Sequence, residues 1–115
     1  MYQSVKIGEK EIPMLAMASV DVYYKHCFGE DPLAIQTKED AGVVDAIDLV
    51  QKMGFIMAKF AETKDRKEML KLNEEAYLDW LDQFERNDLI TALPDIRAVY
   101  DGEKVTSSEE KKPVS

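Results

Sequence analysis

The stretch that decides the fold is GVVDAIDLVQKMGFIMAKFAE, residues 42–62. Two adjacent rows of apolar residues repeat along it at helical spacing. One row holds Val43, Ile47, Val50, Gly54, Met57 and Ala61, and the other holds Ala46, Leu49, Met53, Ile56 and Phe60. An apolar arc this wide is typical of a helix that is buried on most of its circumference. The sequence therefore predicts a central core helix over residues 42–62, with Gly54 allowing a close crossing by another element.

The N-terminal residues MYQSVKIGEKEIP, 1–13, have the pattern of a small β-hairpin. Val5 and Ile7 alternate with polar neighbours, Gly8 offers a turn, and the chain then returns. We expect the hairpin to end at Pro13.

A first helix is expected directly after the hairpin, from Met14 to Phe28. Gly29 follows it as a left-handed C-cap, and residues 30–40 then read as a loop. The apolar face of this helix is expected to hold Leu15, Ala18, Val22 and Cys27.

Two further helices are expected in residues 73–102. Asn73 is a good N-cap for a helix that runs to Glu85, because its side chain can accept from a free backbone amide. Asn87 can cap the next helix in the same way. Pro94 should kink or restart that last helix because proline lacks the amide donor.

These elements predict a mostly α fold of about four helices with a small N-terminal β-hairpin and a disordered C-terminal tail. Residues 1–102 form one domain, and residues 103–115 have too little apolar content to fold. The core is expected to centre on Ile47, Val50, Met53, Phe60, Trp80, Leu81 and Phe84.

The composition argues against several kinds of partner. The 115 residues include 15 basic and 23 acidic side chains, and the net charge of −8 disfavours binding to nucleic acid. No apolar run approaches the roughly 20 residues of a membrane span, so no membrane partner is expected. A single cysteine agrees with a reducing compartment.

Candidate catalytic or metal-binding residues are few. Glu75, Asp79 and Asp82 share one stripe of a helix, but a solvated helix face explains such a row without a ligand. His26 and Cys27 are neighbours, and neighbours in a helix point about 100° apart. The sequence also lacks a glycine-rich phosphate loop and paired CxxC motifs. We therefore expect no enzyme, and no catalytic, cofactor-binding or metal-binding residues.

The run YLDWLDQFERNDLITALPDIRAVYDG, residues 77–102, resembles the tail assembly chaperones of long-tailed bacteriophages and of prophages of Gram-positive hosts. The N-terminal hairpin and FGEDPLAI, residues 28–35, add to the likeness. The resemblance implies a strand pair that leads into a helical domain. It also implies a chaperone without enzymatic activity, which coats the tape measure protein until tail tube subunits polymerise around it.

Further expectations follow from this resemblance alone. A longer frameshifted form would recruit the tail tube protein, and the chain itself would be the shorter product. Both would act in the host cytoplasm and would not be expected in the mature virion. Apart from the resemblance, a homo-oligomer is also expected, because exposed apolar patches mark self-association interfaces. The alternatives are a small acidic helical regulatory or adaptor protein and a structural virion component.

An apolar surface is the expected means of holding such a client, because buried apolar area contributes more than exposed ion pairs. Candidate client-binding residues lie at helix ends or on a second apolar face. They are Met14, Met17, Tyr77, Ile90 and Tyr100. Burial in the chain's own core, or in a self-association interface, is the competing interpretation for each.

Overall fold

The computed structural model describes residues 2–36 and 42–103. Within these ranges lie a two-stranded antiparallel sheet and six helices, four of them with seven or more residues. The elements are β1 (Tyr2–Ile7), β2 (Lys10–Leu15), α1 (Val20–Phe28), α2 (Pro32–Gln36), α3 (Val43–Thr63), α4 (Arg66–Met69), α5 (Glu74–Leu81) and α6 (Arg86–Tyr100). The expectation of a mostly helical fold with an N-terminal hairpin is confirmed.

The hairpin is longer than the sequence suggested. β1 and β2 pair from Tyr2 with Leu15 to Ile7 with Lys10, and Gly8 makes the turn with a φ of 65°. The expected end at Pro13 is wrong, because each strand of a two-stranded sheet has an open edge that needs no amide donor. Met14 therefore lies on β2 and not in a helix.

Helix α1 begins six residues later than expected, at Val20, after a turn in which the Val20 amide donates to the Met17 carbonyl (3.0 Å). Its end agrees with the sequence. Gly29 has a φ of 71°, and its amide donates to the Lys25 carbonyl, which closes the helix. The expected loop after it contains the short helix α2.

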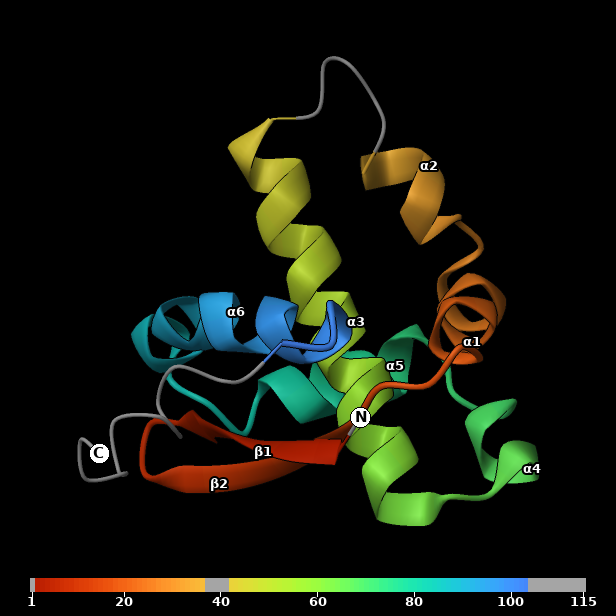
Figure 1. The fold of residues 1–115 in the computed structure, drawn as a ribbon, viewed down its shortest axis with the longest axis horizontal. Coiled ribbons are helices and arrows are strands. Elements are labelled where there is room, and N and C mark those ends of the chain that lie inside the picture. Colours follow the sequence, from red (N-terminus) through yellow and green to blue (C-terminus); the bar gives the residue numbers. More distant parts are fainter. Residues whose placement is uncertain (1, 37–41, 104–115) are drawn as a thin grey trace.

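Helix α3 stands in the middle of the fold, with the hairpin and α6 on one side of it and α1 and α2 on the other (Figure 1). Met53, Phe55, Ile56 and Met57 are all fully buried, so this part of α3 is enclosed on every side. A Cβ atom on Gly54 would lie 3.1 Å from Cγ2 of Ile96 in α6. The close crossing expected at Gly54 is therefore confirmed.

The C-terminal half corrects two boundaries. α5 is capped by Asn73 as expected, since its side chain accepts from the Ala76 amide (2.9 Å), but the helix ends at Leu81 and not at Glu85. The chain then turns so that the Phe84 ring packs edge-on against Trp80, with ring centroids 5.0 Å apart.

Helix α6 follows with Glu85 at its N-cap, so Asn87 is not the cap. It continues without interruption through Pro94, which is exposed. Pro94 removes one backbone hydrogen bond from the helix. Burial of the opposite helix face stabilises the helix, and this gain exceeds the cost of that lost bond. The buried residues of that face are Leu89, Ala92, Ile96 and Val99.

The core contains most of the side chains expected in it. Val50, Met53 and Trp80 are buried, and Phe60, Leu81 and Phe84 pack partly buried against them. Ile47 is only half-buried, near the N-terminal end of α3. No helix within the described ranges combines the length and hydrophobicity that crossing a membrane requires.

Most of the expected C-terminal tail, residues 104–115, lies outside the described residues. Glu103 is described and is held against the domain. Its amide donates to the Ala98 carbonyl (2.7 Å), and its carbonyl accepts from the Gln3 side chain (2.6 Å).

Candidate functional site

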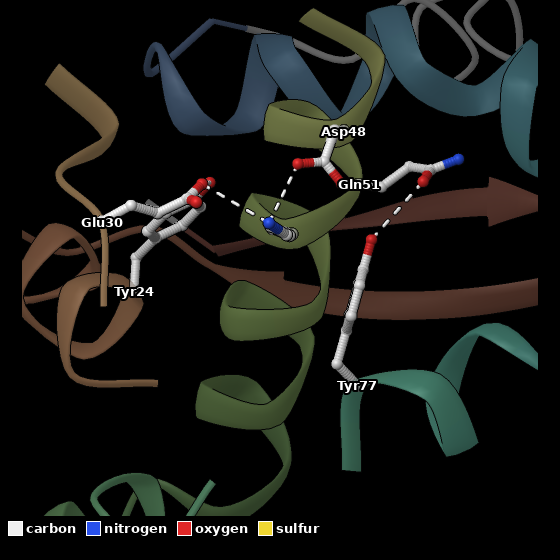
Figure 2. Close-up of polar contacts among 6 residues, drawn as sticks. Tyr24, Glu30, Asp48, Gln51 and Tyr77 are labelled. Atoms are coloured by element: carbon white, nitrogen blue, oxygen red, sulfur yellow. Dashed lines mark hydrogen bonds and ion pairs between the residues drawn. The ribbon is translucent and has the colours of Figure 1, made fainter. Parts of the chain in front are cut away.

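A cluster of polar side chains surrounds Lys52, in the middle of α3 (Figure 2). The Lys52 Nζ atom lies 2.9 Å from Asp48 Oδ2, one helical turn away, and 3.4 Å from Glu30 Oε2, which follows α1. It also lies 4.9 Å from the centre of the Phe28 ring. The side chain is only 12% exposed, so these contacts are partly shielded from water.

Two buried tyrosines flank this cluster. The Tyr24 hydroxyl donates to Glu30 (3.0 Å), and the Tyr77 hydroxyl donates to Gln51 Oε1 (3.4 Å) (Figure 2). Burial raises the pKa of both hydroxyls, and the hydrogen bond to Glu30 raises the pKa of Tyr24 further. Both tyrosines therefore remain neutral hydrogen-bond donors at physiological pH.

The neighbours of Lys52 stabilise its charged form. Burial alone disfavours its charged form, but the hydrogen bond to Asp48 and the charges of Asp48 and Glu30 outweigh this and raise its pKa. A lysine nucleophile needs a lowered pKa instead. Moreover, no buried side-chain nitrogen or oxygen in the described residues lacks a hydrogen-bond partner. The cluster thus fastens the segment after α1 to α3.

Sequence reasoning missed this cluster for an identifiable reason. Asp48 and Lys52 are four residues apart, which is a visible helical ion-pair spacing. Glu30 gave no such signal, because only the packing of α1 against α3 brings it to Lys52.

The residues considered for catalysis are not arranged as a site. His26 is exposed, and its Nε2 atom donates to the Leu70 carbonyl (2.9 Å). Burial, followed by the charge of Glu74, raises the pKa of the Cys27 thiol to about 11, which makes it a poor nucleophile. Across residues 2–36 and 42–103 no group of three or more His, Cys, Asp or Glu side chains could hold a metal ion.

The acidic row on α5 is exposed, as a solvated face should be. In its middle lies Leu78, an apolar side chain that is 52% exposed. We call this surface the α5 ridge; it consists of Glu74, Glu75, Leu78, Asp79 and Asp82.

The candidate client-binding residues lie in different parts of the structure. Met14 and Tyr77 are buried in the core, and Ile90 is half-buried on α6. Met17 is 53% exposed and lines a shallow hollow together with Tyr100. Of the five candidates, only Met17 and Tyr100 are brought together in the described structure.

A hollow with apolar walls lies between α1, α4 and the end of α3. Val22 and Leu70 stand at its sides, 62% and 41% exposed, and its floor is the edge-on pair of Tyr23 and Phe60, with ring centroids 5.4 Å apart. The open space is about 480 Å³. We call it the α1–α4 groove; its lining is Ser19, Val22, Tyr23, Phe60, Lys64, Arg66 and Leu70. The spacing of apolar residues had placed Val22 on the buried face, and this concealed the groove.

The rim of the α1–α4 groove is basic although the chain as a whole is acidic. Lys64 and Arg66 line it, and no ion pair to either residue is present in the described part of the chain. Lys64 directly follows α3 and has a φ of 52°, a left-handed conformation that favours glycine. The Lys64 ammonium lies 5.8 Å from the centre of the exposed Tyr2 ring.

Comparison with known families, with curated proteins and with solved structures gave no match to this chain.

Proposed function

We propose that this chain is a phage tail assembly chaperone that binds and solubilises the tape measure protein through the α1–α4 groove. The observation that supports this best is the pair of exposed apolar side chains, Val22 and Leu70, above an aromatic floor. A groove of this kind suits one apolar face of a client helix. The outward carboxylates of the chain would keep the complex soluble.

The strength of one such contact follows from the area it can cover. Complete burial of a valine or leucine contributes about 1.5–3 kcal/mol. Val22 and Leu70 have 62% and 41% of their surface left to cover, so covering both contributes about 2 kcal/mol. A single groove would hold a client weakly. Many copies along one long client would bind more tightly, because the contacts are then multivalent.

In this proposal the tail tube protein is recruited by a longer frameshifted form, and the complex acts in the host cytoplasm. The aromatic floor and apolar walls provide the affinity, so binding should persist in high salt, whereas exposed ion pairs are screened.

Co-expression with the tape measure protein tests the proposal. Replacing Val22 and Leu70 together with serine should remove most of the client from the soluble fraction. The matched control is Leu33→Ser, since Leu33 is 58% exposed but lies on α2, outside the groove. The control should solubilise the client as the unmodified chain does, and both variants should keep native circular dichroism.

A second variant separates an apolar mechanism from an electrostatic one. Neutralising Glu75, Asp79 and Asp82 as Gln, Asn and Asn should leave client solubilisation intact. If this variant loses the client and the groove variant retains it, the chain is better described as an electrostatic adaptor. If no variant or unmodified chain solubilises the client, the chaperone proposal is refuted.

A further inference from the structure

We infer that the α1–α4 groove of one copy takes the α5 ridge of a second copy, so that the free chain associates through its own client surface. A second copy and the client would then compete for the same groove. This competition rests on the proposed function, whereas the self-association does not. The inference follows from two surfaces of the same chain that complement each other in charge and in apolar pattern.

The α5 ridge supplies an apolar side chain inside a ring of negative charge. Leu78 is 52% exposed, although leucine on a short amphipathic helix usually faces the core. Glu75 and Asp82 lie three and four residues from it along the helix and so share its face. No ridge carboxylate forms an ion pair with a side chain in the described residues.

The α1–α4 groove supplies the opposite pattern. Val22 and Leu70 offer apolar walls, and Lys64 and Arg66 stand beside them without a carboxylate partner in the described part of the chain. By contrast, nearby Lys71 is paired with Glu68 on the same segment (3.3 Å). Within the described residues, neither Lys64 nor Arg66 forms an ion pair, although the chain has a net charge of −8.

Lys64, on the rim, also has an unusual backbone conformation. Its φ of 52° is the conformation at a helix end where glycine fits without steric cost. A lysine there keeps a positive charge at the groove despite its less favourable backbone conformation. Strain of this kind is a reason to look for a role of the side chain.

Docking the ridge in the groove would cover Leu78 with Val22 and Leu70 and set carboxylates opposite Lys64 and Arg66. The apolar contact would supply affinity, and the charges would set orientation and the rate of encounter. Leu78, Val22 and Leu70 are all exposed within one chain, so the ridge does not cover its own groove. A contact between two different surfaces can also continue from copy to copy in a row.

Sedimentation of the full chain, from micromolar to near-millimolar concentration, tests the inference without any client. The unmodified chain should gain mass with concentration. The groove variant (Val22→Ser with Leu70→Ser) and the ridge variant (Leu78→Ser) should each weaken association at least about tenfold, which corresponds to 1.4 kcal/mol. Leu33→Ser should associate like the unmodified chain.

Mixing the groove variant with the ridge variant is the most decisive test. The groove variant keeps an intact ridge, and the ridge variant keeps an intact groove. An equal mixture should therefore form one-to-one pairs at concentrations where each variant alone is largely monomeric. Lys64→Gln with Arg66→Gln should weaken association in low salt and reduce its salt dependence. An unmodified chain that stays monomeric, or a mixture that stays monomeric, would overturn the inference.

Client solubilisation separates this inference from the proposed function. The ridge variant has an intact groove that no second copy covers, so it should solubilise the client at least as well as the unmodified chain. Self-association without client binding would refute the chaperone proposal alone. Client binding by a chain that remains monomeric would refute the self-association alone.

Discussion

Replacement of Gly54 by alanine tests the packing at the centre of the fold. Gly54 lies on α3 where α6 and α5 approach it most closely. A Cβ atom there would meet Ile96 Cγ2 at 3.1 Å, Ile96 Cδ1 at 3.3 Å and Trp80 Cη2 at 3.5 Å. The first two distances are shorter than ordinary van der Waals contacts, and Ile96 is fully buried, so it has little room to move.

Two opposing effects set the change in the free energy of unfolding that Gly54→Ala causes. Alanine is favoured over glycine inside a helix by about 1 kcal/mol. Overpacking of a close-packed core costs typically about 1–3 kcal/mol, and two tight contacts to an immobile side chain place the cost near the middle of this range. The expected net effect of Gly54→Ala is therefore a loss of about 1 kcal/mol in the free energy of unfolding.

Equilibrium unfolding in urea measures this loss, and Trp80 is a convenient reporter because it is the single tryptophan and lies beside Gly54. The slope with urea should stay unchanged while the midpoint falls. Ile96→Val removes the Cδ1 atom, so Gly54→Ala should cost less in that background, and a double-mutant cycle gives the difference. If Gly54→Ala instead stabilises the chain by about 1 kcal/mol, helix propensity dominates and the close crossing does not require glycine.

Three further predictions concern a cap, the groove rim and pH. Asn73→Ala should cost about 1 kcal/mol of stability by removing the N-cap of α5, and Asn73→Ser should restore most of it; equal thermal midpoints for all three chains would contradict this. Lys64→Gly should leave the thermal midpoint unchanged or raise it, since glycine favours a φ of 52°, and should weaken the proposed self-association; a clear fall in the midpoint would show that Lys64 is needed for folding. The folded state raises the pKa of Tyr24, Tyr77 and Cys27, so at alkaline pH it keeps protons that the unfolded chain releases. The free energy of unfolding should therefore be constant below about pH 8. It should fall as the pH rises through the unfolded pKa values, which are about 8.5 for cysteine and about 10 for tyrosine. Tyr77→Phe should make this alkaline fall less steep in urea midpoints, and an unaltered profile would refute the assignment.

The predictions that succeeded rest on short-range signals. Gly29 and Asn73 were assigned as caps because a cap depends on backbone groups within four residues. The central helix was visible because two apolar rows at helical spacing require burial on two sides, whichever elements provide it. The hairpin was visible from alternation around Gly8.

The errors arose where a local signal competed with packing. Pro13 looked like a strand end, yet β2 continues to Leu15 because only one of its edges is paired. Asn87 is a good cap residue, but the turn that brings Phe84 onto Trp80 places the cap of α6 two residues earlier, at Glu85. Pro94 is tolerated within α6 for a similar reason, because burial of the opposite face holds the helix together.

The sequence by itself determined that the chain is mostly helical with an N-terminal hairpin, how two of the helices are capped, and that one helix lies at the centre. Only the tertiary structure decided which apolar side chains remain at the surface. Met14 and Tyr77 are buried while Met17 and Val22 are exposed, although all four are apolar or aromatic residues in similar patterns. The physical reason is that a side chain is buried only when a surface from a distant segment covers it. The local sequence of one segment does not specify which other segment packs against it. The α1–α4 groove exists because α4 is placed beside α1, which no spacing along the chain could indicate.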